Sequence, residues 1–188
     1  MVPGVVVMKK LFTLFFFIVA VMSNDILAEE VLMDVQTKET AIEQLHQLLA
    51  KSLDRADSAL QVEGNFVPYA AVIRRDGVVK KIVLGKDKSL SSEQMLHVLR
   101  ESLKKLAQKG GIAASAIYYT GAGAEGDEEA KILVVELEHS RGVALIRMTP
   151  YQMEGEKVLF GEAVETESEL NVMVRPKDSS VPAEMELK

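Results

Sequence analysis

The sequence predicts an α+β fold: an antiparallel sheet of about five strands with two main helices packed on it, in the order α-β-β-α-β-β-β. Three observations lead to this prediction. Two segments carry apolar residues at helical spacing, several short runs are rich in β-branched and aromatic residues, and an Asp-Gly pair separates two of those runs. Strands joined by tight turns form antiparallel hairpins, and both apolar helix stripes must then be buried against the sheet.

Residues 1–28 have the pattern of a secretory signal peptide. Lys9 and Lys10 form a basic start, and residues 11–22 are an uninterrupted apolar run of twelve residues. A helix needs roughly 20 apolar residues to cross a bilayer, so this run is too short for a membrane span. The segment therefore predicts export and no stable membrane insertion after cleavage.

We expect cleavage near Ala28, which makes the product periplasmic or secreted. A cut after Ser23 is the alternative site, and an uncleaved interfacial anchor is the alternative to cleavage. The remaining chain has the length of one ordinary domain, which we place at residues 29–174. Residues 175–188 contain Pro and Ser, are polar and have no period, so they predict a disordered tail.

Composition excludes several classes of function. The chain has a formal charge of −6, and removal of residues 1–28, with two lysines and one aspartate, leaves −7. An acidic protein repels phosphate backbones and anionic headgroups, so nucleic acid is not an expected partner. The chain contains no cysteine, which excludes disulfides, thiolate metal ligands and cysteine catalysis. No metal site and no cofactor are predicted.

The first predicted helix begins near Thr37, which can act as its N-cap. Its apolar residues follow one another at spacings of three or four and lie on one face: Ile42, Leu45, Leu49, Leu53 and Ala56. Gly64 and Asn65 end the pattern. One face of this helix is therefore expected to be buried.

Residues 65–84 predict a β-hairpin, because two β-rich runs flank Asp76 and Gly77 and glycine tolerates the positive φ of such turns. Pro68 cannot donate to a strand ladder, so the first strand is expected to be an edge strand at its start or to begin at a bulge there. An exposed edge at Pro68 and Tyr69 would be a candidate contact surface for a partner.

The second predicted helix covers residues 90–108. Ser91 and Gln94 have the spacing of a capping box, and Gly110 can take the left-handed conformation after the last turn. Its stripe consists of Leu96, Leu99, Leu103 and Leu106.

The rest of the chain predicts strands. The stronger candidates are residues 112–120, 130–138 and 143–148, and the weaker ones are residues 157–164 and 170–174. Residues 139–142 (HSRG) predict the tight turn between the second and third of these strands.

Two stretches, FVPYAAVIRRDG at residues 66–77 and VVELEHSRGVALIRMTPY at residues 134–151, together resemble a family of small uncharacterised exported bacterial proteins. The resemblance covers most of the expected domain and implies no particular activity. The order of elements is similar to that of roadblock and profilin-like folds, in which a five-stranded antiparallel sheet carries helices.

The sequence GAGAEG at residues 121–126 matches the dinucleotide-binding pattern G-x-G-x-x-G letter for letter. A true dinucleotide loop leads from a strand into a helix, and here a predicted strand follows instead. Four acidic residues would also repel the phosphates of a nucleotide: Glu125, Asp127, Glu128 and Glu129. We therefore interpret the segment as a loop. Asp127, Glu128 and Glu129 lack the alternating spacing of a calcium loop, which leaves cation binding open, and the four acidic residues are candidate partner-binding residues.

The segment 136–139 holds the densest group of reactive side chains: Glu136, Glu138 and His139. On a strand the two glutamates point to one face and His139 to the other. The three are candidate catalytic residues for acid–base chemistry. The competing interpretation is that they are solvated residues before a polar turn, where burial is too small to perturb a pKa.

The motifs of zincins, serine hydrolases and P-loop enzymes are absent from the sequence. The sequence therefore favours an exported, non-enzymatic binding protein of the inhibitor or immunity type, with a protein partner. A homodimer is compatible with this function. The alternatives are a hydrolase or lyase with an acidic or histidine site at residues 136–139, and a small-ligand carrier, which the aromatic content of 5% disfavours.

Overall fold

A computed structural model describes residues 36–84, 90–122, 131–155 and 157–173. The chain divides into two compact units, Met1–Thr40 and Ala41–Lys188. In the first unit only residues 36–40 are described, and they are helical. The expected signal peptide, tail and acidic loop residues lie outside the described residues. The sheet and the helices that cover it belong to the second unit.

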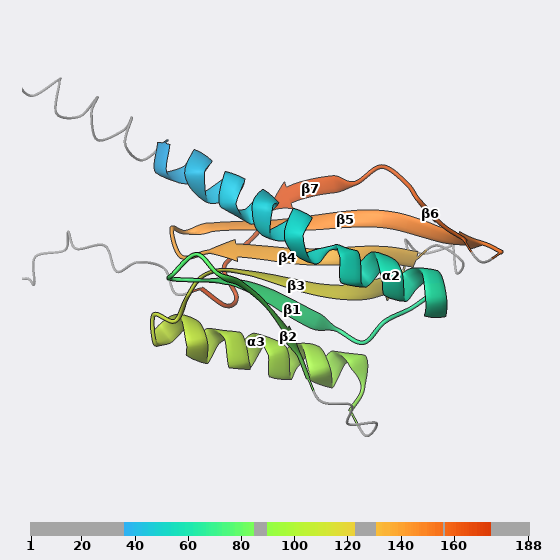
Figure 1. Cartoon of the computed structure of the whole chain (residues 1–188), viewed down its shortest axis with the longest axis horizontal. Helices are drawn as coiled ribbons and strands as arrows, with labels where there is room; N and C mark the ends of the chain where they lie inside the picture. Colours follow the sequence, from blue (N-terminus) through green and yellow to red (C-terminus); the bar gives the residue numbers. More distant parts are fainter. Residues whose placement is uncertain (1–35, 85–89, 123–130, 156, 174–188) are drawn as a thin grey trace, which may run out of the picture. The chain divides into compact units, whose positions relative to one another are not determined.

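The described residues of the second unit form an antiparallel seven-stranded sheet. Its strands are β1 (Tyr69–Arg74), β2 (Val79–Val83), β3 (Ile112–Ala122), β4 (Lys131–His139), β5 (Val143–Glu154), β6 (Lys157–Phe160) and β7 (Val164–Glu167). The order across the sheet is β2-β1-β3-β4-β5-β6, and β7 also pairs with β5 (Figure 1). The predicted α+β class with an antiparallel sheet is confirmed.

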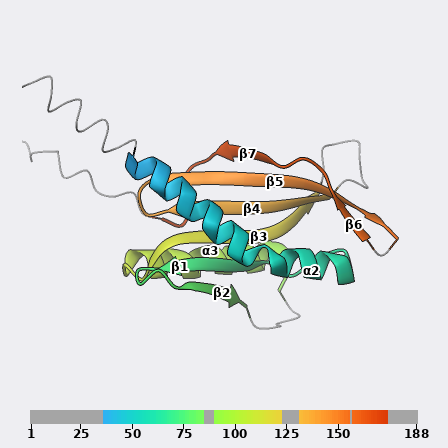
Figure 2. The same cartoon turned by 45° about the horizontal axis from the view of Figure 1, so that its top comes forward.

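The sheet has seven strands among the described residues and not about five, because two further short strands, β6 and β7, form after β5. β5 has twelve residues, and its two halves pair with different strands. Leu145–Met148 pair with β7, whereas Tyr151–Glu154 pair with β6 (Figure 2). The expected strand at residues 157–164 is interrupted after Phe160, and residues 170–173 lie in no strand.

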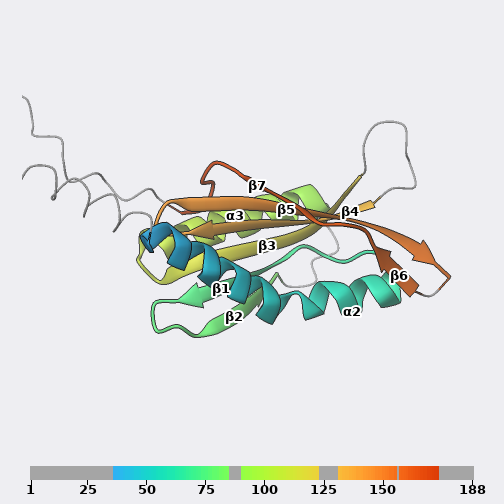
Figure 3. The same cartoon turned by 90° about the horizontal axis from the view of Figure 1, so that it is seen from above.

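One face of the sheet is covered by helix 41–52 and by α2 (Asp54–Glu63), which follow each other with a single turn residue, Leu53, between them (Figure 3). This face, called the α2 face below, holds the larger apolar cluster, which includes Leu45, Leu48, Leu60, Tyr69, Tyr118 and Leu137. The predicted stripe is therefore buried as expected. Thr37 lies inside the described helix and is not its N-cap.

The interruption at Leu53 is caused by the side chain of Tyr69. Its hydroxyl donates to the carbonyl of Ser52 at 2.8 Å and accepts from the N–H of Ala56 at 3.2 Å. Those two groups are four residues apart and would bond to each other in an unbroken α-helix. A side chain inserted into the hydrogen-bond ladder bends a helix, so β1 determines where this helix breaks.

The opposite face, called the α3 face, is covered by α3 (Ser92–Gln108). The predicted capping box is present: the hydroxyl of Ser91 accepts from the N–H of Gln94, and the Gln94 side chain accepts from the N–H of Ser91. Leu99 and Leu103 pack against Ile117 of β3 and against Val172. Helices thus cover both faces of the central strands, which explains why β3 contributes buried apolar residues to both clusters.

The prediction of an edge strand at Pro68 is wrong. β1 lies between β2 and β3, and the edge strand of this hairpin is β2. Pro68 immediately precedes β1, where no ladder donor is required, and it is fully buried. The predicted turn itself is confirmed, because β1 and β2 are antiparallel and Gly77 has a φ of +79°.

Candidate functional site

Glu136 lies on the α3 face in the middle of β4 and is buried, with 7% of its surface exposed. Its carboxylate accepts two hydrogen bonds from the guanidinium of Arg100 on α3, at 2.5 and 3.1 Å. The hydroxyl of Tyr119 donates a third at 2.9 Å. Through these hydrogen bonds Glu136 connects β4 to α3. The interpretation of Glu136 as a solvated residue is therefore wrong.

The Glu136 carboxylate also contributes to raising the pKa values of its two hydrogen-bond partners, Arg100 and Tyr119. Hydrogen bonding to Glu136 raises the pKa of Arg100 above its ordinary value. Burial, and then the charge of Glu136, raise the pKa of Tyr119 to about 12. Both groups therefore keep their protons at neutral pH, which preserves the donors that a buried carboxylate requires.

Glu138 lies on the same face and is buried even more completely, with 3% of its surface exposed. Its two carboxylate oxygens accept the backbone N–H groups of Asn171, Val172 and Met173, each at 2.8 Å. Those three residues follow β7 and have no strand partner. Glu138 thus satisfies the backbone of an irregular segment and holds Val172 and Met173 in the apolar cluster of the α3 face.

His139 ends β4 on the α2 face and is 2% exposed. Its Nδ1 accepts the N–H of Arg141 at 3.1 Å, so the neutral ring carries its proton on Nε2 and donates to the Oε1 of Gln44 at 2.9 Å. Burial, followed by the charges of Arg141 and Arg75, lowers the pKa of His139 to about 4. The imidazole is therefore neutral at physiological pH.

The predicted separation of the three candidate catalytic residues is found in the structure: Glu136 and Glu138 share one face and His139 lies on the other. Each side chain is buried and each has a structural partner. A general acid or base must reach a substrate proton within hydrogen-bond distance. In the described residues, Glu136 bonds to α3, Glu138 to residues 171–173 and His139 to helix 41–52. Among these described contacts, none joins two of the three side chains to each other.

The partner-binding candidates that the structure describes are also buried. Tyr69 is fully enclosed, and its ring stacks on that of Tyr118 with centroids 4.5 Å apart. Burial raises the pKa of both hydroxyls, that of Tyr118 to about 12. Pro68 and Tyr69 therefore offer no side-chain surface to a partner. The other candidates, Glu125, Asp127, Glu128 and Glu129, lie outside the described residues.

An ionic cluster that sequence reasoning missed joins helix 41–52 to the end of the sheet. His46 Nε2 lies 2.9 Å from an oxygen of Glu165 on β7, and Arg147 of β5 lies 3.7 Å from the other oxygen. His46 and Glu165 are 119 residues apart, so only the pairing of β7 with β5 could reveal this contact. The described residues contain no group of three or more histidine and acidic side chains suited to a metal ion.

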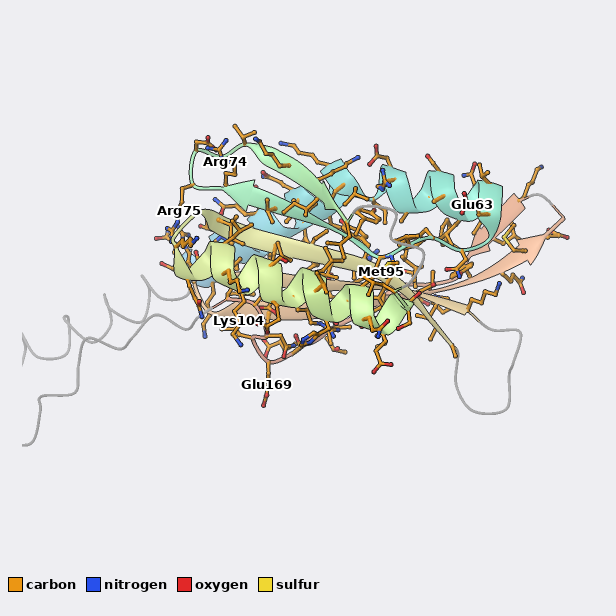
Figure 4. The ribbon with its side chains drawn as sticks, turned by 90° about the horizontal axis from the view of Figure 1, so that it is seen from below. Glu63, Arg74, Arg75, Met95, Lys104 and Glu169 are labelled. Atoms are coloured by element: carbon orange, nitrogen blue, oxygen red, sulfur yellow. The ribbon has the colours of Figure 1, made fainter. Side chains whose placement is uncertain are left out.

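One exposed feature of the sheet is β2, the edge strand with the sequence VKKIV. Val78 immediately before the strand and Val83 at its end are 47% and 46% exposed. Lys81 pairs with Asp54 of α2, and Arg74 pairs with Asp76 in the turn. Figure 4 shows Arg74 and Arg75 at the turn of this hairpin, far from Glu63 at the end of α2.

Of the helices in the described part of the chain, none has the length and apolar character that crossing a bilayer requires. Comparison of the chain with models of protein families, with curated proteins and with solved structures finds no match. The likenesses expected from the sequence therefore stay predictions, and the candidate site rests on the geometry of the chain itself.

Proposed function

We propose that the protein is an exported, non-enzymatic binding protein of the inhibitor or immunity type, and that it binds an extended segment of a partner protein along the free edge of β2. The observation that carries this proposal is the position of β2. It is a terminal strand of the sheet, and in the described residues it pairs with β1 alone.

The backbone of β2 is arranged for the addition of a strand. Arg74 donates its N–H to the carbonyl of Val78, and opposed residues of antiparallel strands alternate between bonded and non-bonded pairs. By this alternation Val79, Lys81 and Val83 direct their N–H and C=O groups away from β1. Main-chain bonds to such an edge supply affinity for a peptide of extended conformation.

The side chains of the β1–β2 hairpin indicate an acidic partner segment. The hairpin has one acidic residue, Asp76, although the whole chain has a formal charge of −6. Its four basic residues are Arg74, Arg75, Lys80 and Lys81. Lysines on an edge discourage pairing with a second copy of the same edge, because identical strands would oppose like charges. Lys81 is paired with Asp54 of α2, so an extended segment with acidic residues next to apolar ones would match Lys80 and the exposed valines.

The alternatives have less support. A hydrolase or lyase at residues 136–139 would have to use Glu136, Glu138 and His139, which are buried and engaged in structural contacts. A small-ligand carrier would need space between the helices and the sheet. That region is occupied by large, fully buried side chains, among them Tyr69, Tyr118 and Leu45.

The proposal is tested with a photoreactive benzoylphenylalanine at Val83 in cells that export the protein. We expect a covalent adduct with a cell-envelope protein, and an attachment site in an acidic, extended segment. A matched probe at Val98, an exposed valine on α3, should give no such adduct. The attached segment, made as a synthetic peptide, should bind the purified protein, and added salt should weaken that binding because exposed charges are screened.

Charge reversal supplies the second arm. Lys80 is exposed, and no ion pair is found for it among the described residues, so Lys80→Glu should fold normally and lower affinity for the peptide. Glu101→Lys on α3 is the matched control and should bind as the unmodified protein does. The proposal is abandoned if Val83 gives no adduct, if Val98 gives the same adduct, or if Lys80→Glu leaves affinity unchanged.

A further inference from the structure

The other end of the sheet has an edge of a different kind. β6 is the terminal strand on that side, and the described residues place no strand beyond it. Its hairpin with β5 extends past the ends of the neighbouring strands (Figure 1). Leu159 and Phe160 are 40% and 42% exposed. Unlike β2, this edge presents apolar side chains with a single lysine, Lys157, at its start.

The register of β6 shows which backbone groups are free. Gly161 donates its N–H to the carbonyl of Pro150, so Gly161, Leu159 and Lys157 direct their backbone groups toward β5. Val158 and Phe160 direct theirs toward the free edge. Their side chains lie on the α2 face, where they oppose Met153 and Tyr151 of β5, and the Leu159 side chain lies on the α3 face.

We propose that β6 pairs with β6 of a second copy of this chain, antiparallel and centred on Leu159. In that register Val158 of each copy bonds to Phe160 of the other, so both residues with free backbone groups are used. Leu159 opposes Leu159 of the second copy on the α3 face, and each Val158 opposes a Phe160 on the α2 face. Cross-strand apolar pairs of this kind stabilise antiparallel sheets.

The charges of this segment favour the same arrangement. Lys157 begins β6, and Glu162 follows its end. Antiparallel pairing places Lys157 of one copy opposite Gly161 of the other, beside Glu162, so that opposite charges meet at both ends. Antiparallel self-pairing of β2 centred on Lys80 or on Lys81 would instead oppose that lysine with the same lysine of the second copy. Of the two terminal strands, β6 is therefore the self-complementary one.

The size of the contact sets its strength. β6 has four residues, and strands of this length bury less than the roughly 1,000 Å² that a stable interface requires. The pairing is accordingly weak and depends on protein concentration. It is independent of the partner proposed for β2, because the two edges lie at opposite ends of the sheet.

The first test is sedimentation equilibrium of the protein from about 10 µM to about 1 mM, the range in which weak complexes form. We expect the mean mass to rise from that of a monomer toward that of a dimer. Leu159→Lys opposes two like charges at the centre and should keep the protein monomeric, whereas Val83→Lys on β2 should still dimerise. A monomer at every concentration, or equal loss of the dimer in both variants, overturns the proposal.

Disulfide trapping tests the register directly, since the chain has no cysteine of its own. Cα atoms of a directly opposed, non-bonded pair lie about 4.5 Å apart, within disulfide range. Leu159→Cys should therefore form a covalent dimer on oxidation. Val83→Cys, which changes a similarly exposed residue on the other edge, should not. A covalent dimer of the Val83→Cys variant, with none of the Leu159→Cys variant, would assign self-association to β2 and refute the pairing of β6.

Discussion

A single hydroxyl, that of Tyr69, replaces a backbone hydrogen bond of the helical segment above it. The hydroxyl is fully buried and contacts one orphaned donor, the Ala56 N–H, and one orphaned acceptor, the Ser52 carbonyl. The Ser52 side chain extends this network, since it bonds to the Leu48 carbonyl and to the hydroxyl of Tyr118, each at 2.6 Å. The polar groups at the helix break are therefore satisfied by one another.

Replacement Tyr69→Phe should destabilise the fold by about 1–3 kcal/mol, because it leaves a buried donor and a buried acceptor without the hydroxyl that joins them. Urea unfolding followed by circular dichroism measures the loss. Tyr151→Phe is the matched control, because its hydroxyl makes one longer bond, 3.3 Å to the carbonyl of Gly64. Equal losses in the two variants would contradict the role assigned to Tyr69.

His139 makes the stability of the fold depend on pH. The ring is neutral in the folded protein because burial lowers its pKa from 6.5 to about 4. Between those two values the unfolded chain binds more protons than the folded one, so stability rises with pH in this window. The contribution is complete above about pH 6.5 and is lost as pH falls toward 4.

We therefore expect the free energy of unfolding to decrease by up to about 3 kcal/mol between pH 7 and pH 4 on account of His139. His139→Gln should remove that part of the slope while other groups continue to titrate. His97→Gln, on the exposed side of α3, is the matched histidine substitution for comparison. The measurement is a series of urea unfolding curves over this pH range, and identical slopes for all three proteins would refute the prediction.

At the scale of elements, the segment after β7 depends on a carboxylate supplied by β4. Residues 171–173 have no strand partner, yet Val172 and Met173 are buried. An irregular backbone can be buried only where its N–H groups are satisfied, and Glu138 satisfies three of them. The chain thus closes the α3 face by a side-chain contact instead of by a further strand.

Glu138→Gln should release this segment, since an amide nitrogen cannot accept the N–H groups that one carboxylate oxygen now accepts. We expect a loss of about 1.5–3 kcal/mol, the range for hydrogen bonds to a charged group, and faster amide hydrogen exchange at Val172 and Met173. Glu167→Gln, an exposed carboxylate on β7, is the control. Unchanged exchange at Val172 in Glu138→Gln would show that apolar packing alone holds the segment.

At the scale of the whole molecule, the two open edges of the sheet differ in charge and in hydrophobicity. β2 combines exposed valines with lysines, whereas β6 combines exposed Leu159 and Phe160 with one lysine. Edge strands are the places where a sheet can add another chain. The different chemistry of the two edges is the reason for assigning an acidic partner segment to one and a second copy to the other.

Local patterns in the sequence were sufficient for much of the fold. Period and capping placed α3 from Ser91 onward, and the Asp76-Gly77 pair placed the β1–β2 turn. Alternation along β4 also separated Glu136 and Glu138 from His139. These features depend on residues close together in the chain, where spacing alone decides which side chains share a face.

The sequence by itself thus determined the α+β class, the antiparallel hairpins and the buried stripe of the first helix. In α3, Leu99 and Leu103 of the predicted stripe are buried, whereas Leu106 is exposed. Only the tertiary structure decided that β1 is interior, that β6 and β7 are two separate edge strands, and that the three reactive residues near the end of β4 are buried and hydrogen-bonded. The physical reason is that burial of a polar group depends on partners distant in sequence. Arg100 for Glu136, residues 171–173 for Glu138 and Gln44 for His139 are brought into contact only by the folded sheet.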